Sequence, residues 1–120
     1  MDELTEKIIG AAIEVHSILG PGLLESIYEE ALCHEFDLRG INYQRQSPCD
    51  IAYKGQTIKG QKLDMLVEKE VVVEIKSMLK MPEVSVAQIL SYLKATNLKR
   101  GLIINFGEKK LFDGVKRVSL

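Results

Sequence analysis

Three residues in the middle of the chain have the types and spacing needed to bind a metal ion and assist hydrolysis. Asp64 precedes Glu74 by ten positions, and Lys76 follows Glu74 after one apolar residue. Carboxylate oxygens are the ligands that Mg²⁺ prefers, and a lysine beside such an ion can hold or help deprotonate an attacking water. These side chains together are suited to metal-assisted hydrolysis of a phosphodiester bond.

The segments that carry these residues are predicted to be adjacent strands. In the segment 71–76, side chains alternate between faces, so Glu74 and Lys76 share the face opposite the odd-numbered apolar residues. In the segment 61–67, Asp64 likewise lies opposite an apolar face, and a short polar connection joins the two segments as a hairpin. Paired in this way, the two carboxylates share a face, where they repel each other unless a cation lies between them.

The rest of the chain supplies helices around a sheet. Apolar residues recur at helical spacing in 4–20 and 23–40, and glycines end both segments. Residues 41–55 read as an extended segment that Pro48 interrupts, 82–98 as a helix, 100–107 as an apolar strand, and 109–120 as a short terminal piece, interpreted as an edge strand. We therefore predict a single α/β domain over residues 1–120, in the order α-α-β-β-β-α-β, with a mixed sheet flanked by helices.

Composition favours a soluble globular protein, because 46% of the residues are hydrophobic and 28% are charged. No apolar run approaches the roughly 20 residues of a membrane span, and the acidic N-terminus does not resemble a signal peptide. Cys33 and Cys49 form no C-x-x-C motif, and with only two histidines they do not suggest a zinc site. Two free thiols indicate an intracellular, cytoplasmic protein.

Charge is distributed unevenly along the chain. Residues 1–37 hold nine acidic residues and one basic residue, whereas residues 94–120 hold seven basic and two acidic residues. The basic end could form a surface that faces phosphates. The alternative is that these residues are ordinary solvated surface charges.

Two motifs resemble a known family. An Asp, nine intervening residues, Glu, one residue and Lys across a hairpin resembles the core motif of the PD-(D/E)XK nuclease superfamily, although Glu-x-Lys on a strand is commonly only an ion pair. The stretch GPGLLESIYEEAL contains Gly22-x-x-Glu25-x-x-Tyr28, which resembles the motif that names the GxxExxY family, grouped with the same superfamily. The resemblance extends over roughly residues 4–118 and implies a restriction-endonuclease-like core.

The resemblance also implies roles for single residues. It makes Asp64 and Glu74 the metal-binding carboxylates and Lys76 the catalytic lysine, and it adds the backbone carbonyl of Ile75, the carboxylate of Glu25 and the amide of Gln88 to the site. The implied metal is Mg²⁺ or Mn²⁺. One departure is Lys62, where the family tends to carry Arg; the charge is kept, but bidentate phosphate recognition is lost.

Each added residue also has a plain structural interpretation. Glu25 stands in the first turn of a predicted helix, where the helix dipole favours an acid, and Tyr28 is better explained by packing. Gln88 lies off the apolar stripe of its helix, on the side of Tyr92, and solvent exposure alone would explain it.

We predict a metal-dependent nuclease that hydrolyses phosphodiester bonds of DNA or RNA, with no membrane association. Two alternatives are a catalytically inactive nucleic-acid-binding or regulatory module of the same fold, and a protein-interaction domain in which Glu74 and Lys76 form only an ion pair. A domain this small would cut both strands of a duplex most easily as a homodimer.

Overall fold

The computed structural model describes residues 2–120. The elements follow the chain as α1 (Glu3–Leu19), α2 (Glu25–Arg39), β1 (Tyr43–Pro48), β2 (Ile51–Tyr53), β3 (Gln56–Ile58), β4 (Lys62–Val67), β5 (Val71–Lys76), α3 (Val84–Thr96), β6 (Arg100–Asn105), the 3₁₀ turn η1 (Leu111–Gly114) and β7 (Val115–Ser119). None of these helices is both long and apolar enough to cross a bilayer.

Five strands form one mixed sheet in the order β1-β4-β5-β6-β7. Strands β5 and β6 pair in parallel and are joined through α3, while the other neighbours pair antiparallel. This arrangement confirms the predicted α/β class with a mixed sheet flanked by helices, and it is consistent with a restriction-endonuclease-like core. Strand β7 lies at the edge of the sheet, as the sequence indicated for the terminal segment.

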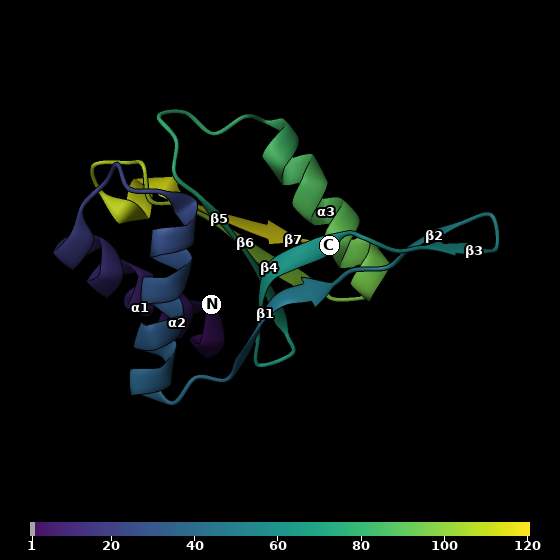
Figure 1. Ribbon diagram of the computed structural model, residues 1–120, viewed down its shortest axis with the longest axis horizontal. Coiled ribbons are helices and arrows are strands. Elements are labelled where there is room, and N and C mark those ends of the chain that lie inside the picture. Colours follow the sequence, from purple (N-terminus) through teal and green to yellow (C-terminus); the bar gives the residue numbers. More distant parts are fainter. Residues whose placement is uncertain (1) are drawn as a thin grey trace.

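The sheet separates two hydrophobic cores. Helices α1 and α2 cover one face and α3 covers the other (Figure 1). The odd-numbered residues of β5 belong to the first core, and Val72 belongs to the second. The two sides of β5 therefore have different roles: one packs against α1 and α2, and the other carries Glu74 and Lys76 toward α3.

Local signals in the sequence fix the helix ends. Asp2 caps α1 by accepting a hydrogen bond from the backbone N–H of Thr5 at 2.8 Å. Helix α2 ends at Gly40 and α3 at Asn97, both in the left-handed region that these residue types tolerate. Both cysteines, Cys33 and Cys49, are buried free thiols.

The predicted element order was wrong between residues 41 and 67. Instead of one interrupted strand before the hairpin, the chain forms β1, β2 and β3, and β2 pairs only with β3 in a separate two-stranded sheet. The first segment is divided because Pro48 ends β1 and the chain then turns back at Lys54 and Gly55, which both have positive φ. We call residues 50–61 the arm; it projects from the body along the longest dimension of the molecule, 46 Å (Figure 1).

Candidate active site

The candidate site lies where the hydrogen-bond ladder between β4 and β5 stops. The two strands pair as a regular ladder from Val67–Val71 to Met65–Val73, and the same register places Asp64 opposite Glu74. At that point side chains replace the ladder. The backbone N–H of Asp64 donates to Glu74 Oε1 at 3.3 Å, and the backbone N–H of Ile75 donates to Asp64 Oδ2 at 2.9 Å. The two carboxylates therefore face each other at the open end of the hairpin.

Glu74 is a carboxylate in an unfavourable environment. Its side chain is only 7% exposed, because β5 is the central strand and α3 covers this face. Burial, followed by the neighbouring Asp64, raises the pKa of Glu74 to about 8, and Lys76 opposes the rise. At neutral pH Glu74 therefore keeps a proton that a bound cation would displace.

Lys76 ends β5 on the same face as Glu74 and is half-buried. Among residues 2–120, no carboxylate lies within ion-pair distance of its ammonium, so the ammonium forms no salt bridge there. Its backbone carbonyl accepts a hydrogen bond from the N–H of Phe106 at 2.8 Å, which fixes the end of β5 against β6. Lys76 is thus held near Glu74 with a free ammonium group.

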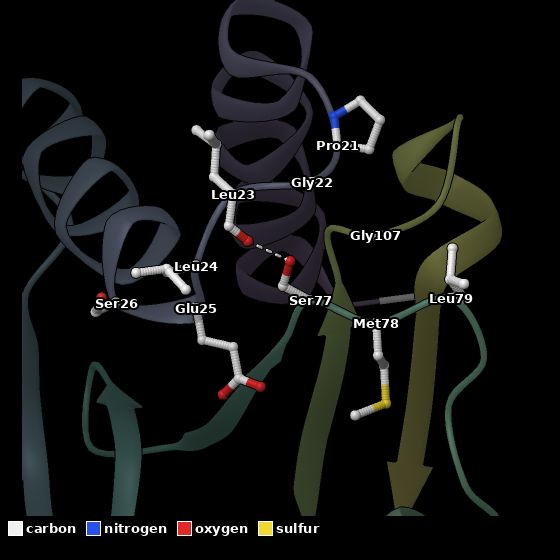
Figure 2. A pocket seen from close by; sticks show the side chains of 10 residues that line it. All are labelled: Pro21, Gly22, Leu23, Leu24, Glu25, Ser26, Ser77, Met78, Leu79 and Gly107. Atoms are coloured by element: carbon white, nitrogen blue, oxygen red, sulfur yellow. Dashed lines mark hydrogen bonds between the residues drawn. The ribbon is translucent and has the colours of Figure 1, made fainter.

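Glu25 lies across a groove from the end of β5. The groove has a volume of about 790 Å³, and its walls come from residues 21–26 on one side and from Ser77, Met78, Leu79 and Gly107 on the other. The hydroxyl of Ser77 donates to the carbonyl oxygen of Leu23 at 2.5 Å and ties the two walls together (Figure 2). The exposed carboxylate of Glu25 and the thioether of Met78 extend toward the same side of this groove.

Tyr28 supports the wall that carries Glu25. Its hydroxyl donates to the carbonyl oxygen of Gly20 at 2.5 Å and accepts the N–H of Leu23 at 3.1 Å. The buried ring stacks on Phe106 with centroids 4.5 Å apart. The sequence-based interpretation of Tyr28 as a packing residue agrees with this environment, since its polar atom holds the loop before α2 and faces no reactive group.

Helix α3 brings polar groups to the same side of the sheet as Glu74. The hydroxyl of Tyr92 accepts a hydrogen bond from the Gln61 side chain at 2.8 Å. Burial raises the pKa of Tyr92, as do the nearby Glu74 and Asp64, whereas a side-chain hydrogen bond with Gln88 opposes that rise. Gln88 itself is exposed, as expected for a residue off the apolar stripe, and its side chain contacts Tyr92.

A comparison with known families shows which superfamily this chain belongs to. A family model described as the PD-(D/E)XK nuclease superfamily matches residues 2–118. The chain belongs to the PD-(D/E)XK nuclease superfamily. No match was found among curated proteins or among solved structures. The resemblance noted in the sequence is thereby confirmed at the level of the superfamily, while the narrower likeness to the GxxExxY family remains a prediction.

Nucleases of the PD-(D/E)XK superfamily generally depend on a divalent metal, and the donor set here fits one. Asp64 and Glu74 supply hard oxygen ligands, and their mutual repulsion is relieved by a proton on Glu74 that a cation would replace. Within the described residues, however, no group of three or more His, Cys, Asp and Glu side chains is close enough to hold a metal. Glu25 therefore does not join the carboxylate pair as a third ligand in this arrangement.

Part of the basic charge near the C-terminus of this PD-(D/E)XK chain is paired with acids of the same molecule. Arg100 at the start of β6 pairs with Asp2 at 2.6 Å and with Glu70 at 3.4 Å, and Arg117 on β7 pairs with Glu6 at 3.5 Å. The arginines of the basic C-terminal part thus contact acids, mainly of the N-terminal helix. The expectation that this part forms a phosphate-facing surface does not extend to these two residues.

Asn105 is a site-supporting residue that sequence reasoning missed. It is 1% exposed and lies beside Lys76 in the parallel pairing of β5 and β6. Its side-chain oxygen accepts the N–H groups of Met78 and Gly107, at 3.1 and 3.0 Å, and its amide donates to the carbonyl of Met78 at 3.0 Å. Asn105 therefore fixes the chain as it leaves β5.

Replacing Asn105 by alanine is expected to lower the free energy of unfolding by about 2–4 kcal/mol, because it leaves three partly buried main-chain groups without their partner. Chemical denaturation measures this change. Asn42→Ala, which alters an exposed asparagine, is the matched control and should stay within about 0.5 kcal/mol of the unmodified protein. Equal stabilities of the two variants would show that Asn105 does not brace the site.

Proposed function

We propose that this protein is a metal-dependent nuclease that hydrolyses phosphodiester bonds of nucleic acid. The observation that carries the proposal is the facing pair of Asp64 and Glu74 at the open end of a hairpin, with the unpaired ammonium of Lys76 on the same face. A sheet has no structural need for two carboxylates in contact on a buried face, and their cost is explained if they bind a cation.

The residues have distinct proposed roles. Asp64, Glu74 and the backbone carbonyl of Ile75 would hold Mg²⁺ or Mn²⁺, and Glu25 would add a carboxylate from α2. The ion would supply Lewis acidity toward a phosphate oxygen. Lys76 orients the attacking water or neutralises the charge that develops on the phosphate, and Gln88 assists from α3. Nucleic acid is the implied substrate, and the buried free thiols fit a cytoplasmic location.

One alternative has an observation in its favour. Glu25 does not lie close enough to Asp64 and Glu74 to bind one metal ion together with them. The fold therefore also suits an inactive nucleic-acid-binding or regulatory module. The other alternative is a protein-interaction domain in which Glu74 and Lys76 form only an ion pair. It is less well supported, because Lys76 forms no ion pair with any carboxylate of residues 2–120. We propose a homodimer only for the case in which the protein cuts both strands of a duplex.

The decisive experiment incubates the purified protein with end-labelled single- and double-stranded DNA and RNA, in Mg²⁺, Mn²⁺ or EDTA. We expect cleavage of at least one substrate with metal and none in EDTA. The Glu74→Ala/Lys76→Ala variant should be inactive, and the Glu14→Gln/Lys7→Met variant, which changes exposed residues of α1, should match the unmodified protein. Binding without cleavage in every lane would reject the nuclease in favour of the inactive module, and the absence of both would favour the interaction domain.

A further inference from the structure

We infer that the arm, residues 50–61, binds a groove of duplex DNA and directs the duplex to the carboxylate site. This inference deepens the proposed function, from which it takes only that nucleic acid is the ligand. It rests on three features of the arm: side chains without a packing role, a rigid attachment beside Asp64, and a surplus of positive charge.

The arm carries large side chains that the body of the protein does not cover. Tyr53 is 59% exposed and Ile58 is 51% exposed. The register pairs Tyr53 with Gln56 and Ile51 with Ile58, so Tyr53 and Ile58 lie on the same face of the ribbon. Across residues 2–120, strands β2 and β3 pack extensively only against each other. An isolated two-stranded ribbon contributes little to stability, and an external partner accounts for its exposed aromatic and aliphatic side chains.

The arm is nevertheless rigidly attached to the site. At its base the N–H of Cys49 donates to the carbonyl oxygen of Gln61 at 2.9 Å, which continues the pairing of β1 with β4. Cys49 is buried in the core between the sheet and α3, and the Gln61 side chain bonds to Tyr92 of that helix. Asp64 follows only three residues after Gln61. A ligand held by the arm is therefore held in a fixed position relative to the carboxylate pair.

The charged side chains of the arm indicate which class of ligand it binds. The arm contains Lys54 and Lys59 against one acid, Asp50, and Lys62 follows directly after it at the start of β4. The exposed ion pair between Lys59 and Asp50, at 3.1 Å, is of the kind that contributes little, so a phosphate can replace the aspartate. Lys54 lies over the ring of Tyr53 at 5.5 Å, which places a cation beside an aromatic face at the tip. These groups complement a phosphate backbone, whereas the arm of a second copy would bring like charges together.

The shape of the arm selects a duplex. A two-stranded ribbon fits the major groove of B-DNA, which is about 12 Å wide, but not the deep and narrow major groove of A-form RNA. Gln61 lies seven positions after Lys54 at the tip, a reach of roughly 20 Å at about 3.3 Å per residue.

The test measures equilibrium binding in EDTA, where no cleavage occurs. The probes are a labelled 24-base-pair DNA, the matching RNA duplex and one of the DNA strands alone. The variant Lys54→Glu/Lys59→Glu reverses two charges of the arm. Its matched control is Lys7→Glu/Lys69→Glu, because these exposed lysines lie outside the arm and outside the basic C-terminal part, and they give the same change in net charge. Thermal unfolding verifies that both variants are folded.

We expect the unmodified protein to bind duplex DNA more tightly than either other probe. The arm variant should weaken duplex binding at least about tenfold near 0.1 M salt and reduce the slope of log K against log salt by about 2, while the control changes affinity less than about threefold. Equal effects of the two variants, or a preference of the unmodified protein for RNA or single strands, would overturn the inference.

Self-association is the competing outcome, and a second variant addresses it. Tyr53→Ser/Ile58→Ser removes the exposed apolar side chains of the arm without changing its charge. Suppose that the unmodified protein sediments as a dimer, and that this variant sediments as a monomer and still binds the duplex. This result would show that the arm docks on a second copy and not on DNA.

Because binding is measured without metal, arm-dependent binding without cleavage would reject only the nuclease, whereas cleavage with arm-independent binding would reject only this inference.

Discussion

Lys76→Met is expected to reduce metal-dependent cleavage by at least about 100-fold while the protein still binds Mg²⁺. This expectation follows from the position of Lys76 on β5. Lys76 lies on the face of β5 that carries Glu74, two residues further along the strand, and its ammonium makes no described ion pair. Methionine keeps the length and apolar stem of the side chain and removes only the charge, so the loss measures electrostatic assistance to the reaction.

Two measurements separate this effect from damage to the metal site. Cleavage is followed at saturating Mg²⁺, and the rise in melting temperature caused by Mg²⁺ is measured in parallel. Lys69→Met changes an exposed lysine at the other end of β5 and should cleave normally. If Lys76→Met cleaved at the normal rate, the lysine would have no catalytic role, and the PD-(D/E)XK motif of this chain would have to act through its carboxylates alone.

Glu74→Gln is expected to stabilise the metal-free protein at pH 8 by about 2–4 kcal/mol and to leave its stability at pH 4.5 nearly unchanged. In the folded protein Glu74 keeps its proton up to a pKa of about 8, whereas in the unfolded chain it loses that proton near its ordinary value of 4.5. Between these pH values the folded protein binds the extra proton, so the free energy of unfolding falls as pH rises.

Glutamine abolishes this fall because it is neutral at every pH and can donate a hydrogen bond to Asp64 as the protonated acid does. Denaturation at pH values from 4.5 to 8.5, in EDTA, measures the effect, with Glu14→Gln as the control for an exposed glutamate. With Mg²⁺ the order should reverse, since the unmodified protein gains stability by binding the ion and Glu74→Gln does not. Parallel pH profiles of Glu74→Gln and the unmodified protein in EDTA would contradict the burial of a protonated Glu74.

The sequence was most informative where periodicity and burial agree. The apolar stripes of α1 and α2 predicted their buried sides, and the alternation of side chains along β4 and β5 predicted that Asp64 and Glu74 share a face. The arm was missed because most of its residues are exposed on both faces, so it shows no alternation. Its tight turn is Lys54-Gly55, which lacks the Asn-Gly or Asp-Gly pair that usually signals a hairpin.

Other parts of the site depend on contacts that no local pattern encodes. The position of Glu25 is set by how α2 packs on the sheet, so its distance from the carboxylate pair does not follow from its place in a helix. Asn105 reads as an ordinary residue at the end of a strand. Its importance comes from the path of the chain after β5, which only the folded structure reveals.

The open end of the β4–β5 hairpin also gives the molecule two built-in reporters. The amide protons of Asp64 and Ile75 are bonded to carboxylate oxygens. The strength of those two bonds changes with the charge on the carboxylates. In an amide spectrum of the labelled protein, these two signals would therefore follow the protonation of Glu74 and the arrival of a cation directly, without any substitution or added dye.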